Sequence, residues 1–560
     1  MFKGHPKGLF VAFFTNMGER FGFYTMIAIL ALFIQAKFGF DSTRVSLIYG
    51  IFMAMLYGLP ILGGLMADKW LGYGKTISFG IIIMFLGYLL LSIPSVHGEG
   101  LGLIICALGV IALGTGLFKG NLQALVGNLY DDPKYSSVRD RAFNIFYMGI
   151  NIGAMFAPTA AEKVSNWILN TYHFTYDANI PALANNCLND KLIDPFAYLS
   201  IAQKQDASVT IDSLKLFSTH YLDALGKSYH YAFSVACLSL IISMAIFWIF
   251  KKHYKHADLT EKQKSKSKEH QAQVIELTPK QIRERLIALF LVFFVVIFFW
   301  MSFQQNGLCM TFFARDYTQP TVGKFTNLFF DLFGLLSIFL SVIGLVYLVK
   351  KSSSATTRII GGIAFAGFAT IAILRFLGYQ DINPFTPQKF QHFNPFFIVA
   401  LTPLIIGFFG WLNNRGKEPS APRKIGYGML ITALAFTILI FASIGMPSPA
   451  SLKGTVAPAN VLVSPYFLVV TYFILTIAEL FLSPMGISFV SKVAPPKYKG
   501  TMQGFWFAAT GVGNFLLFVG GWLWGVMPLW GLWLVLVVSC LLSALFIFSV
   551  MKRLERVTAG

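Results

Sequence analysis

The sequence is poor in charged residues. They make up 12% of its 560 positions, whereas ordinary soluble domains carry about 25%. Apolar residues make up 56%, and the mean hydropathy is +0.65. Apolar runs of about 18 residues or more recur along the chain, and this length spans the hydrocarbon core of a bilayer. A water-soluble fold is therefore excluded, and the sequence predicts an all-α protein that crosses a membrane many times.

Cysteine is also scarce, with five residues and no CxxC pair or His/Cys cluster. Neither a metal site nor a disulfide framework is predicted, and no cofactor is expected. Acidic residues number 25 against 44 basic ones. The basic residues gather between apolar runs, as the positive-inside rule describes, so a nucleic-acid partner is not expected. The first apolar run is too long for a signal peptide and is expected to be a membrane helix.

Apolar segments of membrane-helix length predict fourteen spans. They lie near 8–36, 45–67, 77–95, 101–127, 142–165, 229–251, 285–309, 326–350, 358–378, 395–413, 425–446, 465–490, 501–526 and 529–551. An even count places both termini on one side of the membrane. Lys3, Lys7, Lys552, Arg553 and Arg556 indicate that this side is the cytoplasm.

A basic segment divides the chain into two apolar halves, which predicts the major facilitator fold of two six-helix bundles, with substrate bound near the midplane. An extra pair of spans is expected to form a peripheral hairpin that serves packing or a partner. The predicted parts are bundle helices 1–5 (1–165), an outer loop (166–228) with a short amphipathic helix near 211–225, helix 6 (229–251), a cytoplasmic linker (252–284), the next helix with an outer loop (285–325), the hairpin (326–378), the remaining helices (379–552) and a cytoplasmic tail (553–560).

Few charged residues fall inside the predicted spans. An unpaired charge at the bilayer centre costs about 2.5–3.5 kcal/mol on insertion scales, so each one is a functional candidate. The adjacent Glu19 and Arg20 are either a structural ion pair or part of a substrate pathway. Asp331 and Arg375 lie near the ends of their spans and are expected to reach the membrane surface.

Arg20, Lys119 and Glu479 predict a cavity with opposite charges on its two walls, because two cations lie in the first half and one carboxylate in the second. Such a cavity suits a zwitterion. The planar guanidinium would bind its carboxylate, and Glu479 would bind its amine. The alternative is that Glu479 pairs directly with a cation as a latch between the halves, and this latch is compatible with a binding site.

Several segments, in order along most of the chain, resemble motifs of the proton-dependent oligopeptide transporter family. They are ERFGFY (19–24), GGLMADKWLGYGKT (63–76), GTGLFKGNLQALVGNLY (114–130), FYMGINIGAMFAP (146–158), FNPFFI (393–398), YFILTIAELFLSPMGISFVSKVAP (472–495) and GFWF (504–507). The third motif departs from the family pattern in carrying Gly120 in place of proline.

The resemblance implies a monomeric, proton-coupled transporter that imports di- or tripeptides across the cytoplasmic membrane by alternating access, with lipid as its other partner. It is not expected to be an enzyme, because no nucleophile–base set or phosphate loop is present. By resemblance, the substrate-binding residues are Arg20, Tyr24, Tyr57 and Lys119 at the carboxyl end and Asn151, Asn394 and Glu479 at the amino end. Conformational roles fall by resemblance on Asp68, Lys69, Ser483 and Pro484.

Two amides replace family carboxylates. Asn16 stands at the first Glu of the family's E-x-x-E-R motif, and Gln304 stands where the seventh helix usually carries Glu. Since neither amide can take up a proton, Glu19 and Glu479 remain as candidates for proton coupling, with Asp331 as a remote third. The alternatives are a facilitator without proton coupling, a carrier of another zwitterion or carboxylate compound such as a siderophore or drug, and a receptor that binds without translocating.

Overall fold

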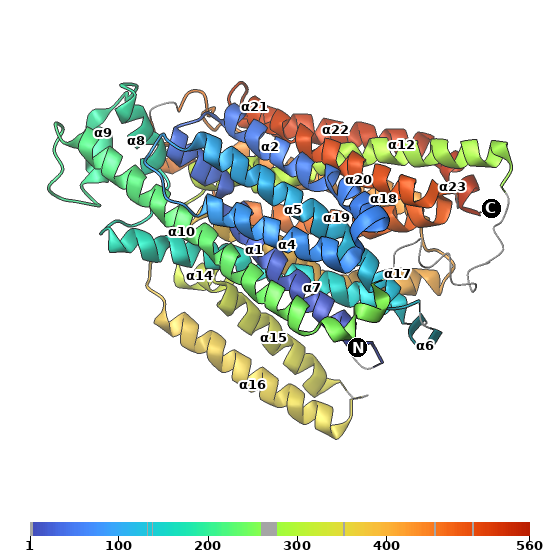
Figure 1. Ribbon diagram of the computed structural model, residues 1–560. Coiled ribbons are helices and arrows are strands. Elements are labelled where there is room, and N and C mark those ends of the chain that lie inside the picture. Colours follow the sequence, from blue (N-terminus) through green and yellow to red (C-terminus); the bar gives the residue numbers. More distant parts are fainter. Residues whose placement is uncertain are drawn as a thin grey trace.

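The computed structural model describes residues 4–131, 133–136, 138–258, 277–350, 353–452, 455–495 and 498–559, and nearly all of its elements are helices (Figure 1). The first half comprises α1 (Lys7–Phe38), α2 (Ser42–Gly58), α3 (Pro60–Met66), η1 (Ala67–Leu71), α4 (Tyr73–Leu91), α5 (Leu101–Asn128), α6 (Pro133–Ser136), α7 (Arg139–Thr171), α8 (Ile180–Leu188), α9 (Pro195–Ala202), α10 (Leu214–Ile249), η2 (Lys251–His253) and η3 (Lys255–Ala257).

The second half begins after the predicted linker, most of which (259–276) lies outside the described residues. It comprises α12 (Pro279–Phe303), η4 (Gln304–Gly307), α13 (Cys309–Asp316), β1 (Thr321–Val322), α14 (Lys324–Phe330), α15 (Leu332–Val349), α16 (Ala355–Gly378), β2 (Asn383–Pro384), η5 (Pro387–His392), α17 (Phe393–Asn413), α18 (Ala421–Ser443), η6 (Ala459–Val461), α19 (Tyr466–Val493), α20 (Lys499–Leu516), α21 (Phe518–Trp524), α22 (Leu529–Ser549) and α23 (Met551–Ala559).

Several helices start at capping residues that the sequence supplies. Asp41 accepts a hydrogen bond from the backbone of Arg44 at the start of α2. Thr278 and Gln281 form a capping box at the start of α12. Such caps satisfy backbone N–H groups that have no partner inside the helix. The apolar runs then continue each helix across the membrane.

Small residues let neighbouring membrane helices approach closely. In the first half, α4 packs along α5, and a Cβ added at Gly80 would lie 2.8 Å from the carbonyl oxygen of Gly114. The other main contacts of this half join α1 to α7 and α10. In the second half, α18 packs against α19 and α22, while α12 packs against α20. The two halves meet where α2 contacts α20 and α21, and where α7 contacts η5 and α17.

Both termini lie at one end of the molecule, away from α8 and α9 (Figure 1). We call the two ends the termini end and the α8–α9 end. Thirteen helices in the described part of the chain are long and apolar enough to cross a membrane, and they cover thirteen of the fourteen predicted spans. The remaining span, 142–165, is α7. It is a helix of 33 residues, but polar residues such as Asn144, Asn151 and Lys163 dilute its apolar run.

The outer loop predicted for 166–228 is shorter and more helical than expected. The helix α7 continues to Thr171, and α10 begins at Leu214, so the short helix predicted near 211–225 is part of one 36-residue helix. The break expected before 229 is absent because residues 214–228 contain no proline and only one glycine, Gly226. Between them, α8 and α9 cover this end of the molecule. The predicted tail also begins within a helix, α23.

The extra hairpin is α15 and α16, which lie side by side at one edge of the molecule (Figure 1). The strands β1 and β2 close its base, because Val322 before the hairpin pairs with Asn383 after it. In α16 only Gly361 and Ala372 are buried, so most of its surface remains open to lipid.

Asp331 and Arg375 do not extend separately to the membrane surface, as the sequence led us to expect. The guanidinium Nη1 of Arg375 lies 2.5 Å from the Oδ2 atom of Asp331. The same carboxylate accepts hydrogen bonds from the Tyr379 hydroxyl, at 2.9 Å, and from the backbone of Gly334 at the start of α15. The prediction failed because pairing between two helices satisfies both charges without either side chain having to reach water.

Candidate functional site

A central cavity of about 260 Å³ lies between the two halves. Its walls come from α1, α2, α5 and α7 of the first half and from α12, η4, η5, α17, α19 and α20 of the second. All seven predicted substrate-binding residues line it: Arg20, Tyr24, Tyr57, Lys119, Asn151, Asn394 and Glu479. The fold therefore brings together residues that lie up to several hundred positions apart in the sequence.

Arg20 and Glu19 form a two-point ion pair within α1. The Nε and Nη2 atoms of Arg20 donate to the two carboxylate oxygens of Glu19 at 2.6 and 2.7 Å. Both side chains are almost fully buried, and the guanidinium also lies 4.8 Å from the centre of the Phe23 ring. Arg20 lines the cavity, whereas Glu19 does not. Glu19 thus holds the guanidinium in place from behind the cavity wall.

Lys119 presents its ammonium group to the ring of Tyr57, 4.0 Å from the ring centre. This cation–π contact is weaker than an ion pair and is readily exchanged for a contact with an anion. Within the described part of the chain, no carboxylate lies within ion-pair distance of Lys119. Lys119 is therefore the cavity cation that is available to an anionic group.

Glu479 faces Lys119 and Arg20 from the second half and is 8% exposed. One carboxylate oxygen accepts a hydrogen bond of 2.9 Å from the Nδ2 atom of Asn394, which also donates to Thr476. No cation among the described residues pairs with Glu479, so the direct latch between the halves is not formed in this conformation. The two opposite charges are left facing a shared space.

The two amides that replace family carboxylates, Asn16 and Gln304, also line the central cavity. Among the described lining residues, Glu479 is the only carboxylate. Asn151 also lines the cavity, and its Nδ2 atom donates to the backbone oxygen of Tyr147. The space is therefore rich in neutral amides and hydroxyls around two cations, Arg20 and Lys119, and one anion, Glu479.

The four residues with predicted conformational roles do not cluster. Ser483 lines the cavity, and Pro484 follows it inside α19. Asp68 lies in η1, at the termini end, and accepts a hydrogen bond of 2.9 Å from the Tyr73 hydroxyl. The side chain of Lys69 lies outside the described residues.

The sequence assigned no individual role to most of the other lining residues, although several of them, such as Trp506 and Phe507, lie within the motifs quoted above. They include Tyr49, Gln123, Tyr147, Trp300, Gln391, Tyr472, Trp506, Phe507 and Thr510. Aromatic residues make up 16% of the chain, so composition gives no means of choosing those that face the cavity. Gln391 lies in η5, in a connection between the predicted spans.

Two halves of membrane-spanning helices around a polar central cavity define a transporter of the major facilitator class. The model of the POT family matches residues 74–270 and 375–519, which is more than half of the chain. The protein belongs to the POT family. It is a multi-pass membrane protein, and because its relatives are transporters, the expectation that it is not an enzyme is confirmed.

Similar proteins span nearly the whole chain. The dipeptide and tripeptide permease B of Xenorhabdus bovienii (strain SS-2004) is 28% identical over 519 residues, covering 91% of this chain and 86% of the relative. The di-/tripeptide transporter of Lactococcus lactis subsp. cremoris is 27% identical over 538 residues, covering 91% and 87%.

Solved structures share the fold. The crystal structure of a peptide transporter POT in complex with sulfate has a TM-score of 0.65 at 22% identity, covering 100% of this chain and 97% of its own. A POT family transporter in complex with 5-aminolevulinic acid has a TM-score of 0.66 at 19% identity, covering 99% and 98%.

Proposed function

We propose that the protein is a secondary active transporter that imports di- and tripeptides by alternating access, with protons as the coupling ion. The observation that carries the proposal is the pair of opposite charges, Lys119 and Glu479, which face one cavity from different halves without pairing. A short peptide with free ends is a zwitterion that neutralises both charges. The names of the relatives, which are di- and tripeptide transporters, support this substrate class.

In this proposal the peptide carboxylate contacts Lys119 and Arg20, with Tyr24 and Tyr57 beside them. The amine contacts Glu479, which Asn394 orients, and also donates to the side-chain oxygen of Asn151 on the opposite wall. Recognition of both ends leaves the side chains among aromatic residues, which tolerate varied apolar groups. Asp68, Lys69, Ser483 and Pro484 act in the conformational change.

We place the termini end in the cytoplasm and the α8–α9 end outside, as the basic residues near the chain ends indicate. Both cavity walls come from one chain, which supports a monomer as the functional unit. Glu479 and Glu19 are the proposed proton-binding groups. Of the two, we favour Glu479, because Glu19 is held by the guanidinium of Arg20.

The test is uptake of a labelled dipeptide into vesicles that contain the purified protein, with and without an inward proton gradient. We expect accumulation with the gradient and its loss in Glu479→Gln. Lys215→Gln is the matched control, because it removes one charge from an exposed ion pair within the first half. Absence of uptake by the unmodified protein, or unchanged accumulation in Glu479→Gln, would contradict the proposal.

A second candidate is a facilitator that moves the same substrates without protons. One observation favours it: Asn16 and Gln304, which line the cavity, are amides at positions where the family pattern has carboxylates. Uptake that equilibrates the peptide but ignores the imposed gradient would support it. Failure of dipeptides to compete for transport would instead favour another zwitterion or carboxylate compound.

A further inference from the structure

A buried polar contact joins the two halves, and its residues do not line the central cavity. Glu162 belongs to the first half of the molecule, in the C-terminal part of α7, and is 7% exposed. Its Oε1 atom accepts a hydrogen bond of 2.7 Å from the hydroxyl of Thr386 and lies 3.4 Å from the ammonium group of Lys389. Thr386 and Lys389 belong to the second half, at η5. We call this three-residue contact the clasp.

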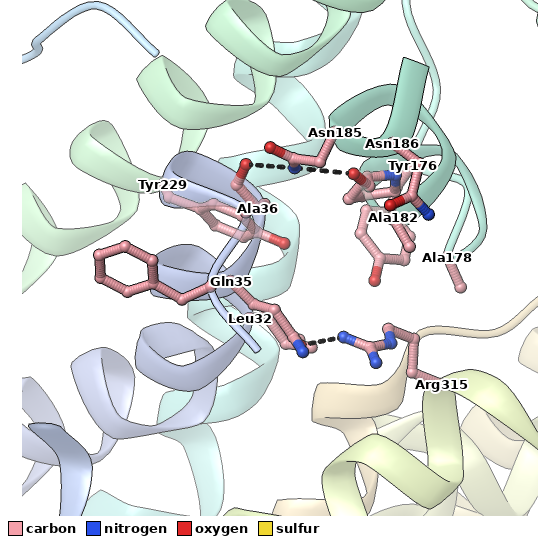
Figure 2. A pocket seen from close by; sticks show the side chains of 13 residues that line it. Leu32, Gln35, Ala36, Tyr176, Ala178, Ala182, Asn185, Asn186, Tyr229 and Arg315 are labelled. Atoms are coloured by element: carbon pink, nitrogen blue, oxygen red, sulfur yellow. Dashed lines mark hydrogen bonds between the residues drawn. The ribbon is translucent and has the colours of Figure 1, made fainter. Parts of the chain in front are cut away.

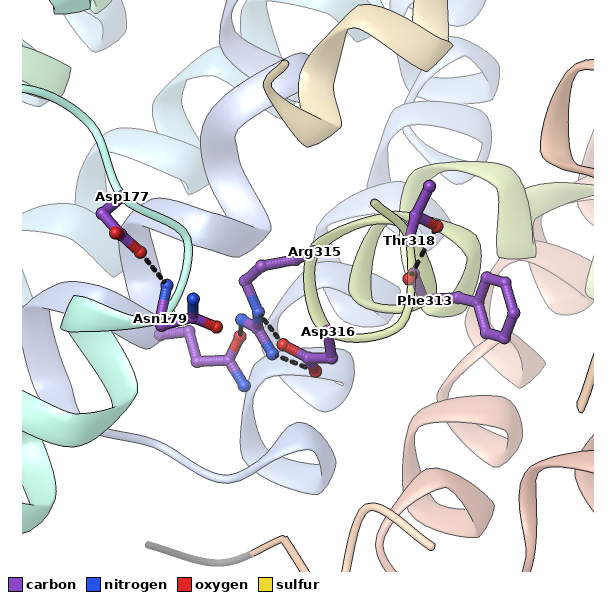
Figure 3. A network of polar contacts seen from close by, with 7 residues as sticks. Asp177, Asn179, Phe313, Arg315, Asp316 and Thr318 are labelled. Atoms are coloured by element: carbon purple, nitrogen blue, oxygen red, sulfur yellow. Dashed lines mark hydrogen bonds and ion pairs between the residues drawn. The ribbon is translucent and has the colours of Figure 1, made fainter. Parts of the chain in front are cut away.

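A second contact between the halves lies at the same end. Arg315 of α13 points across to α1 and donates to the side chain of Gln35 (Figure 2). Two further hydrogen bonds, of 2.5 and 2.7 Å, tie Arg315 to the neighbouring Asp316, next to the turn at Asp177 and Asn179 (Figure 3). Together, the clasp and Arg315 join the two halves on the α8–α9 side of the central cavity.

The energetics of the clasp make it selective for one conformation. A buried ion pair contributes little relative to apolar residues, but separating its partners inside the protein leaves uncompensated charges and is strongly unfavourable. Alternating access requires α7 and η5 to move apart on this side, since they belong to different halves. The clasp therefore stabilises the conformation that is closed at the α8–α9 end and is lost in the one that is open there.

The surroundings of the clasp leave room for water beside its charged groups. A cavity of about 340 Å³ adjoins Glu162 and Lys389 and is also lined by Asn166, Asn170 and the exposed Trp167. Because this cavity is polar and roomy, water can hydrate both charges once they separate. The neighbouring Lys163 does not compete for Glu162, since its ammonium group lies over the ring of Phe333, 5.1 Å from its centre.

We propose that Glu162 is a positioning residue for transport, which through Lys389 and Thr386 holds the halves closed at the α8–α9 end and sets the balance between the two access states. The role given to Glu162 rests on the proposed transport function, whereas the test of that role does not require transport. None of the sequence motifs contains Glu162, and its partners lie in another half of the chain.

The test measures access to the central cavity from each side. Ile27 lines the cavity, so Ile27→Cys provides a reporter thiol, in a background in which the exposed Cys106 is replaced by serine. A membrane-impermeant maleimide is added to right-side-out or to inside-out vesicles. In Glu162→Gln and in Lys389→Gln, we expect labelling from the α8–α9 side to rise about tenfold, which corresponds to about 1.4 kcal/mol, and labelling from the termini side to fall.

Two further variants separate the clasp from general loosening of the fold. The charge swap Glu162→Lys with Lys389→Glu restores an ion pair and should return both labelling rates towards those of the unmodified protein. Lys215→Gln breaks an exposed ion pair within the first half and should change neither rate. Opposite shifts on the two sides are not expected from a destabilised protein, in which labelling rises on both.

Unchanged labelling in the two single variants would overturn the proposal, as would a rise on both sides or a charge swap that fails to restore the rates. The labelling needs no substrate, so failure of the proposed function can be distinguished from failure of the proposal about the clasp. If the variants shift access as expected but the unmodified protein takes up no dipeptide, the proposal about the clasp is supported and the proposal of peptide transport is contradicted.

Discussion

The charges of the central cavity differ in how freely they can meet a ligand. Arg20 already uses its Nε and Nη2 atoms to bind Glu19. The ammonium group of Lys119 lies over the face of the Tyr57 ring, and an ammonium ion over a ring keeps most of its charge available. Lys119 should therefore contribute more than Arg20 to the charge that a carboxylate meets. Arg20 adds shape, because its planar group is held in a fixed position.

This difference predicts the result of replacing Lys119 by glutamine. Under the proposed function, Lys119→Gln should weaken binding of a dipeptide with a free carboxylate by about tenfold or more, since hydrogen bonds to charged groups are worth about 1.5–3 kcal/mol. The same variant should bind a dipeptide amide about as well as the unmodified protein does. The measurement is competition for uptake by each of the two peptides.

The amide peptide serves as the control for damage to the cavity, because it shares every contact except that of the carboxylate. Equal loss of affinity for both peptides would show that Lys119 does not meet the carboxylate. Gln123→Ala alters the same face of α5 without changing charge and should affect both peptides alike.

At the scale of elements, the hairpin α15–α16 depends on a polar contact that crosses it. Asp331→Asn should lower the free energy of unfolding by about 1 kcal/mol, the size of one hydrogen bond or partly exposed ion pair. Asp331 both caps α15 and binds Arg375 and Tyr379. The measurement is the thermal midpoint of the purified protein in detergent.

Asp381→Asn is the matched control, because Asp381 pairs with Lys324 nearby while its side chain is 93% exposed. A pair so exposed contributes little. If both variants melt at the same temperature as the unmodified protein, the contact at Asp331 does not hold the hairpin.

The helices α15 and α16 of the hairpin pack closely at Gly361. Gly361 faces α15, and a Cβ added there would lie 2.8 Å from the carbonyl oxygen of Gly344. Gly361→Val should therefore destabilise the protein by about 1–3 kcal/mol, the usual range for overpacking. Gly367→Val, on the same helix but with nothing within 4 Å, should leave the thermal midpoint unchanged. Equal effects of the two substitutions would mean that α15 and α16 do not pack as described.

The elements show which features the sequence can predict. Thirteen spans follow from hydropathy because the bilayer requires long apolar runs whatever their partners. The extent of α10 does not follow, since its first residues are mixed and their helix is stabilised by packing against α8 and α9. The pairing of Asp331 with Arg375 does not follow either, because it joins two different helices, and hydropathy does not encode which side chains of two helices meet.

At the scale of the whole molecule, the sequence predicted which residues converge on the cavity through the resemblance of its motifs. The charges alone predict that Arg20, Lys119 and Glu479 share a cavity, since charged residues inside apolar spans are few. The clasp escaped prediction for the opposite reason. Glu162 lies in the most polar of the spanning helices, and Lys389 lies in a connection between spans, so neither charge stands out.

At the same scale, the driving force depends on the carboxylates of the central cavity. Among the described residues that line it, Glu479 is the only one, whereas the family pattern has carboxylates at the positions of Asn16 and Gln304. A peptide and a proton are coupled only if a group binds the proton in one access state and releases it in the other. Among the described lining residues, Glu479 is the only carboxylate that can do so. We therefore expect uptake by the unmodified protein to rise with the imposed proton gradient and this dependence to be lost in Glu479→Gln.

Gln304→Glu would restore the carboxylate of the family pattern in the opposite half of the binding space from Lys119. An ionised carboxylate there attracts the cavity cations, whereas the protonated form leaves them to the peptide. The variant should therefore take up peptide more slowly at neutral pH on both sides and respond more steeply to an inward proton gradient. Gln391→Glu places a carboxylate in the same cavity, outside the family position, and should slow uptake without steepening the response. An equal response of both variants would show that added charge alone, and not its position in η4, sets the coupling.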